Sequence, residues 1–150
     1  MKNIEGIVVL ETIDEITDPK HTALLIIDVQ NDNSSPEGSV AKRGNDISWI
    51  IEILPRIKRV LEEARKLGLL IIFTRTIKFK DGSDASGPRL RLLQRAVHVR
   101  GIKDYYIEGT WGNEVLDELE PRANERQVFK LRSSGFFWHP LRHDIAKQEY

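Results

Sequence analysis

Two continuous aliphatic runs stand out along the chain, ALLIIDV at residues 23–29 and LGLLIIFTR at residues 67–75. Neither run shows the polar alternation of a half-exposed strand, and both are typical of strands covered on both faces of a parallel sheet. Between them, apolar residues recur at three- and four-residue spacing from Ile47 to Leu67, which is the pattern of an amphipathic helix. Strand, helix and strand predict a right-handed parallel βαβ unit and an α/β fold.

The ends of the predicted helix carry their own signals. Asp46 is a candidate N-cap, and Gly68 suits the C′ position at which a helix stops. Pro55 lies inside the helical pattern and removes one backbone hydrogen bond there. We therefore expect either a kink or two helical pieces that join near Leu54.

The remainder of the chain is less periodic. Residues 76–112 contain the turn signal KDGSD and a mixture of basic, aromatic and glycine residues, which predict a loop excursion with room for one short helix. The segment GNEVLDELEP predicts a helical turn that ends at its proline, and RQVFKLR at residues 126–132 predicts a third short strand. Another helix is expected from His139 onward. No repeat, low-complexity tract or linker divides the sequence, so residues 1–150 are expected to form a single domain.

Charge and composition exclude several classes of protein. The formal net charge is zero, which gives no global field for nucleic acid or an anionic membrane. A basic run, PRLRLLQRAVHVRGIK, could form an RNA-binding face with Tyr105 and Tyr106 as stacking partners, but the acidic stretch that follows favours an intramolecular charge match. No apolar run approaches the roughly 20 residues of a membrane span. With no secretory signal in its first residues, the chain is expected to be a soluble cytoplasmic protein.

Polar residues follow all three predicted strands. Asp28 ends the first strand, Arg75 follows the second, and Lys130 lies on or just after the third. The carboxyl ends of parallel strands meet at one edge of a sheet, so we expect the three side chains to converge there. A carboxylate beside an amine suits proton transfer, because each shifts the pKa of the other. The alternative is that Asp28 caps a turn and Lys130 forms an ordinary ion pair.

The succession IDVQND, SSPEGS, IIFTR, DGSD, EGTWGNEVLDEL and VFKLRSSGFF resembles the isochorismatase-like cysteine hydrolases. The likeness is greatest to their amidohydrolase branch, which includes N-carbamoylsarcosine amidase and ureidoacrylate hydrolase. The resemblance implies a Rossmann-like parallel sheet flanked by helices with strand order 3-2-1-4-5-6, of which this chain would form the first half to two-thirds. It further implies a homo-oligomer that cleaves a C–N bond of a small amide or carbamoyl compound. No cofactor or metal is expected, and the charge and composition predict neither a membrane nor a nucleic-acid partner.

The resemblance also implies site residues. The family uses a catalytic triad of Asp, Lys and Cys, and the first two match Asp28 and Lys130. In the implied mechanism a thiolate attacks the carbonyl carbon, the aspartate carries the proton, and the lysine holds the thiolate. The sequence contains no cysteine, and the family's cysteine follows the lysine by some tens of residues. The alternative function is therefore an inactive truncated remnant or a partner subunit that lacks the nucleophile.

Two aromatic residues are candidates for substrate binding by the same resemblance, Trp111 in GTWG and Phe136 in SGFF. Both are equally compatible with ordinary core packing. Asn33 departs from the family pattern, which usually has Phe after QND.

Three further expectations concern nucleophiles, metals and the sheet edge. Ser133 or Ser134 could act as a substitute nucleophile beside Lys130, although no oxyanion hole can be named. His139 and His143 stand four residues apart, but no third metal ligand is evident, and surface histidines are the favoured interpretation. If the strand at residues 23–29 lacks its outer neighbour, it becomes an exposed apolar edge that another subunit could complete.

Overall fold

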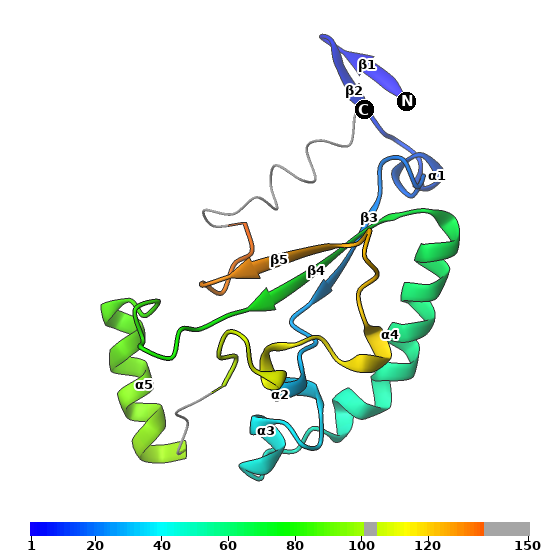
Figure 1. The fold of residues 1–150 in the computed structure, drawn as a ribbon. Helices are drawn as coiled ribbons and strands as arrows, with labels where there is room; N and C mark the ends of the chain where they lie inside the picture. Colours follow the sequence, from blue (N-terminus) through cyan, green and yellow to red (C-terminus); the bar gives the residue numbers. More distant parts are fainter. Residues whose placement is uncertain (101–104, 137–150) are drawn as a thin grey trace.

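A computed structural model describes residues 1–100 and 105–136 of the chain. Its main sheet contains three parallel strands, β3 (Ala23–Ile27), β4 (Leu70–Thr76) and β5 (Arg126–Lys130), in the order β3-β4-β5 (Figure 1). This order corresponds to the first three strands of the expected arrangement. The α/β fold with a parallel, Rossmann-like sheet is therefore confirmed.

Helix α4 (Ser48–Leu67) crosses from β3 to β4 and packs along the sheet (Figure 1). Its buried side chains join a core cluster with residues of both strands, comprising Ile26, Leu61, Ala64, Ile71, Phe73, Val115 and Leu119. The expected stop is confirmed, since Gly68 takes a left-handed φ of 72° at the end of the helix.

One detail at the helix differs from the expectation, and one of the two alternatives at Pro55 is excluded. The N-cap position is Ile47, and the Asp46 carboxylate instead accepts a hydrogen bond from Ser48 N at 2.8 Å, one residue inside the helix. Pro55 lies within one continuous helix, so the division into two pieces does not occur. Leu54 and Ile57 pack against the core on either side of the proline, and this packing offsets the missing hydrogen bond.

The segments between the strands contain more helix than the sequence pattern indicated. Helix α5 (Gly87–Arg100) has 14 residues where a short helix was expected. The predicted helical turn at residues 112–121 is replaced by two short 3₁₀ turns, η1 (Trp111–Asn113) and η2 (Asp117–Leu119). Short helices α2 (Asn31–Ser34) and α3 (Ser39–Lys42) follow β3.

An amino-terminal element precedes the sheet. Strands β1 (Lys2–Ile4) and β2 (Ile7–Val9) form an antiparallel hairpin that lies away from the main sheet (Figure 1). Helix α1 (Ile13–Ile16) follows, and a capping box between Thr12 and Glu15 fixes its start.

Strand β3 forms one edge of the sheet as the described residues present it. Ile27 is 61% exposed although it ends an entirely aliphatic strand. An apolar groove of about 380 Å³ runs between this edge and α4, and it is lined by Leu24, Leu25, Ile26, Ile27, Val29, Ile53, Arg56, Ile57 and Val60. The expected apolar edge is therefore present in the described part of the chain.

None of the helices within the described residues has both the length and the apolar character that a membrane crossing requires.

Candidate active site

The two predicted catalytic residues meet at the carboxyl end of the sheet. Asp28 directly follows β3, and its backbone N–H donates to Thr74 O at 3.0 Å, so the strand pairing continues to this residue. Lys130 ends β5 and is in register with Thr76 at the end of β4. Three neighbouring strands thus deliver one carboxylate, one hydroxyl and one ammonium group to the same edge.

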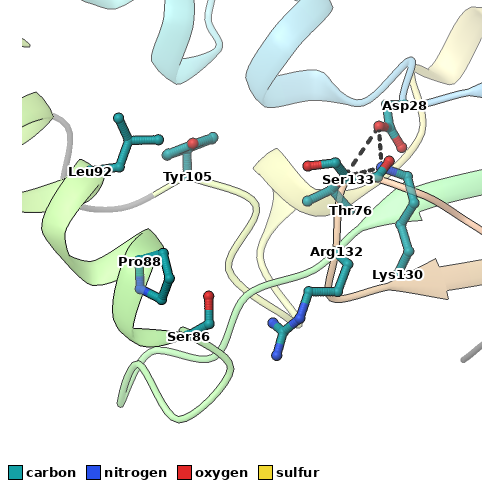
Figure 2. Close-up of a pocket in the computed structure, with 9 residues that line it drawn as sticks. All are labelled: Asp28, Thr76, Ser86, Pro88, Leu92, Tyr105, Lys130, Arg132 and Ser133. Carbon is teal, nitrogen blue, oxygen red and sulfur yellow. Dashed lines mark hydrogen bonds and ion pairs between the residues drawn. The ribbon is translucent and has the colours of Figure 1, made fainter. Parts of the chain in front are cut away.

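These three groups form a closed set of contacts (Figure 2). Lys130 Nζ lies 2.6 Å from Asp28 Oδ2 and donates to Thr76 Oγ1 at 2.7 Å. The Thr76 hydroxyl in turn donates to Asp28 Oδ2 at 3.2 Å, and the Thr74 hydroxyl donates to Asp28 Oδ1 at 3.2 Å. The lysine side chain is 5% exposed and the aspartate side chain 25% exposed. The carboxylate is therefore the more accessible member of the pair.

The backbone at Asp28 is unusual. Its φ is 54°, in the left-handed region that non-glycine residues seldom adopt and that Asp and Asn tolerate best. Asn33 donates its side-chain N–H to Asp28 O at 3.3 Å. The left-handed turn ends the strand and holds the carboxylate over the ends of β4 and β5. Strain of this kind is often found at functional sites.

A buried amide fixes Thr76 in place. Gln30 is fully buried, accepts a hydrogen bond from Thr76 N at 2.8 Å and donates to Thr76 O at 3.0 Å. Asn113, 1% exposed, also donates to Thr76 O at 2.8 Å. The sequence reasoning missed Thr74, Thr76 and Gln30. The signal available for the two threonines was their spacing of two on a strand, which places both on one face.

The expectation that Arg75 joins the site is wrong. Its guanidinium donates to Asn113 O at 3.0 Å, to Asn113 Oδ1 at 2.8 Å and to Gln127 Oε1 at 3.0 Å. It also lies 5.0 Å from the centre of the Phe129 ring. Successive residues of a strand face opposite sides of the sheet, so the residue that follows Arg75, Thr76, faces Asp28 instead. Burial lowers the pKa of Arg75.

A cavity of about 610 Å³ opens beside the ion pair, within the range of small-molecule sites. Figure 2 shows Asp28, Thr76 and Lys130 on one side and residues at the start of α5 on the other. Its lining residues are Asp28, Thr76, Ser86, Pro88, Leu92, Tyr105, Lys130, Arg132 and Ser133.

The two tyrosines that were considered as nucleic-acid stacking partners belong to this region. Tyr105 lines the cavity, and Lys78 Nζ lies 3.0 Å from the centre of its ring. Tyr106 is buried, and its backbone N–H donates to Asp32 Oδ2 at 2.6 Å. Burial, followed by the negative charge of Asp28, raises the pKa of the Tyr106 phenol, which stays neutral. Both rings are occupied by contacts within the protein.

The two predicted substrate-binding aromatics lie outside the set of cavity-lining residues. Trp111 is 46% exposed and borders a hollow that also contains Asp32 and Ser39, while its backbone O accepts a hydrogen bond from Asn31. Phe136 is 55% exposed and is the last residue before an undescribed segment. Their role in substrate binding stays a prediction.

The remaining candidates can be placed as follows. Ser133 lines the cavity, and its backbone O lies 3.5 Å from Lys130 Nζ. His139 and His143 fall outside the described residues. Within the described ranges, no group of three or more His, Cys, Asp or Glu side chains is arranged to hold a metal ion.

Comparison with known sequences gives consistent matches. The ureidoacrylate amidohydrolase RutB of Caulobacter segnis is 35% identical over 134 residues, covering 80% of this chain and 53% of that protein. RutB of Agrobacterium fabrum is 32% identical over 128 residues, covering 79% of this chain and 55% of that protein. The chain thus spans about half the length of the curated relatives it matches.

Comparison with solved structures agrees. A cysteine hydrolase from Pseudomonas syringae pv. phaseolicola superposes with a TM-score of 0.67 at 26% identity, over 87% of this chain and 55% of that one. N-carbamoylsarcosine amidase from Thermoplasma acidophilum gives a TM-score of 0.59 at 21% identity, over 83% of this chain and 60% of that one, and supports the fold alone. The isochorismatase domain model matches residues 22–149. The chain belongs to the isochorismatase domain family.

Proposed function

We propose that this chain carries the proton-transfer pair of a hydrolase that cleaves a C–N bond of a small amide or carbamoyl compound. The observation that supports this most is the contact of 2.6 Å between Lys130 Nζ and Asp28 Oδ2 at the wall of a cavity. An ordinary surface ion pair would not need a buried lysine or a left-handed backbone at its aspartate. The RutB relatives are ureidoacrylate amidohydrolases, which favours a ureido or carbamoyl group as the one cleaved.

The geometry suits a division of roles between the two charges. Asp28 accepts the proton of an attacking thiol, and the resulting thiolate attacks the carbonyl carbon. The same proton then passes to the leaving nitrogen as the C–N bond breaks and a thioester forms. Water next attacks the thioester, Asp28 takes its proton, and the proton returns to the departing thiolate. Throughout, the ammonium of Lys130 stabilises the thiolate and fixes the carboxylate.

The source of the thiol is part of the proposal. The 150 residues contain no cysteine, so we propose that the thiol comes from protein outside them. The alternative, an inactive remnant or a partner subunit, is suggested only by this missing cysteine. The relatives named as hydrolases favour the enzyme over the remnant.

The open edge of β3 supports a second part of the proposal. An exposed aliphatic strand beside an apolar groove is a surface that proteins normally cover. We propose that another strand or subunit covers it in the working protein, and that the protein is a homo-oligomer. A cytoplasmic location and substrate contacts by Trp111 and Phe136 are retained as predictions of the same kind.

The test uses the purified protein, expressed from its own gene. Ammonia release is measured with a panel of ureido, carbamoyl and simple amide compounds, before and after alkylation with iodoacetamide, and the intact mass locates the alkylated residue. We expect hydrolysis of at least one carbamoyl compound, with loss of activity when a cysteine outside residues 1–150 is alkylated. A protein without thiols and without hydrolysis would support the inactive alternative.

A further inference from the structure

Strand β4 continues beyond the point at which β3 pairs with it. The last pair in their register joins Ile27 to Thr74, and Asp28 then leaves the strand with its left-handed φ. β4 nevertheless runs on to Thr76, which is paired with Lys130 of β5 on the other side. Residues two apart on a parallel strand direct their backbone groups to the same neighbour. Both backbone groups of Thr76 therefore face the side that β3 has left.

The side chain of Gln30 takes the place of the missing strand. Its Oε1 accepts from Thr76 N at 2.8 Å and its Nε2 donates to Thr76 O at 3.0 Å, so one primary amide pairs with both backbone groups as a strand would. Nε2 also donates to Asn113 O at 2.7 Å. The Gln30 backbone is held separately, through a bridge to Val115. Both polar atoms of this fully buried amide are therefore engaged.

We propose that Gln30 is a positioning residue, which acts on the Asp28–Lys130 pair through Thr76. Without the amide, the end of β4 loses its partner on the β3 side. The Thr76 hydroxyl then loses the position from which it accepts from Lys130 Nζ at 2.7 Å and donates to Asp28 Oδ2 at 3.2 Å. Gln30 is 0% exposed and lies outside the set of cavity-lining residues, so its effect is transmitted and not direct. This inference rests on the proposed function, to which it adds a residue that orients the proton-transfer pair.

This arrangement predicts a specific pattern of kinetic effects. Proton transfer depends steeply on the position of the groups, whereas a slightly displaced charge still contributes to binding. Loss of the Gln30 amide should therefore lower kcat and leave KM nearly unchanged. It should have little further effect once the Thr76 hydroxyl is absent, because the amide acts through that hydroxyl. A purely structural contribution of Gln30 would lower the stability without producing either effect.

Three single variants of the full protein, expressed from its own gene, provide the test. Gln30→Met keeps the length of the side chain and removes the amide, and Gln30→Glu keeps an oxygen that can accept from Thr76 N. Asn31→Leu is the matched control, since it removes a neighbouring buried amide that donates to Trp111 O. NMR hydrogen exchange is measured at the Thr76 backbone N–H and at the Lys130 ammonium. Urea unfolding checks that each variant is folded, and Gln30→Glu carries the comparison if Gln30→Met is not.

We expect both groups to exchange about tenfold or more faster in Gln30→Met than in the parent, as for the loss of a buried hydrogen bond. The rates should be intermediate in Gln30→Glu and equal to the parent rates in Asn31→Leu. Faster exchange at Thr76 with an unchanged Lys130 ammonium would make Gln30 a structural residue and overturn the inference. Parent rates at both groups in Gln30→Met, or equal acceleration in Asn31→Leu, would overturn it as well.

Kinetics with a carbamoyl substrate separate this inference from the proposed function. We expect Gln30→Met to lower kcat by about tenfold or more and to change KM by less than about twofold. In a Thr76→Val background it should change kcat by less than about threefold, and fully additive effects would overturn the positioning role. A parent that does not hydrolyse the substrate would contradict only the proposed function, because exchange of the Lys130 ammonium still decides whether Gln30 orients the pair.

Discussion

Thr76 is the residue whose replacement tests the geometry of the charged pair most sharply. Thr76→Val keeps the shape and the strand preference of the side chain and removes only the hydroxyl. That hydroxyl accepts a hydrogen bond from Lys130 Nζ at 2.7 Å and donates to Asp28 Oδ2 at 3.2 Å. Thr74→Val is the matched control, since it removes only a bond to Asp28 Oδ1 at 3.2 Å.

The expected cost follows from burial. A hydrogen bond to a charged group contributes about 1.5–3 kcal/mol when water cannot replace it. Lys130 is 5% exposed, so the lost acceptor should cost about 2 kcal/mol. Asp28 is 25% exposed, and water can replace the donors at its oxygens, so Thr74→Val should cost about 0.5 kcal/mol. The difference corresponds to a shift of roughly 1 M in the urea midpoint.

Urea unfolding of both variants measures this difference. The decisive comparison repeats Thr76→Val in a protein whose ion pair has been removed by two substitutions. Asp28→Asn combined with Lys130→Met removes both charges without leaving either one unpaired. In that background Thr76→Val should cost under about 1 kcal/mol, because the ammonium that needs the hydroxyl is gone. If Thr76→Val is no costlier than Thr74→Val, or costs the same in both backgrounds, the hydroxyl does not bridge the pair.

Three more predictions concern stability and association. Gly112→Ala should cost about 2–4 kcal/mol in free energy of unfolding, since its Cβ would lie 2.4 Å from three atoms of a buried carboxyl group. Glu125→Gln should cost about 2–3 kcal/mol at pH 7, because it breaks a contact of 2.6 Å with Arg65 between two buried side chains. Burial alone would raise the pKa of Glu125, but the hydrogen bonds from Arg65 and the Arg122 backbone have the larger combined effect. The net result is a pKa below the usual value of 4.5. The stabilisation by Glu125 is therefore present above pH 4.5 and is lost as the pH falls through the folded-state pKa. Glu125→Gln should make the free energy of unfolding depend less steeply on pH in this acid range. Ile27→Lys should weaken association through the open strand edge, as measured by sedimentation velocity.

Each of these has a control or a contrary outcome. Gly87→Ala adds a Cβ into open space and should leave stability unchanged or slightly raised, so equal losses at Gly87 and Gly112 would contradict the steric argument. If the pH dependence of the free energy of unfolding below pH 4.5 is the same in Glu125→Gln as in the parent, this carboxylate does not contribute to it. A parent protein that is already a monodisperse monomer with cooperative unfolding would count against coverage of the β3 edge.

The strands were predictable because a short stretch of sequence is enough to identify each of them. A continuous aliphatic run is stable only where both faces are covered, and this fixes the strands and the carboxyl-end position of Asp28. Lys130 was placed at the same edge because RQVFKLR, at residues 126–132, predicted a third strand. Arg75 failed because a difference of one residue reverses the face on which a strand side chain lies, and the sequence alone does not state which face holds the site.

Other features depended on contacts that sequence periodicity does not encode. Thr76 is an ordinary strand residue until its neighbours across two strands are known. The 14 residues of α5 lack a clear apolar stripe, which is the signal by which a helix is recognised.

The most direct test of the central claim is the effect of Asp28→Asn on hydrolysis by the protein purified from its own gene. The change preserves the shape of the side chain and removes the proton acceptor. We expect kcat/KM for a carbamoyl substrate to fall by at least about 10²-fold, the lower range for loss of a general base. Asp46→Asn, at an exposed carboxylate beside the start of α4, should leave kcat/KM unchanged. Hydrolysis at the parent rate in Asp28→Asn would contradict the assignment of the pair as the proton-transfer unit.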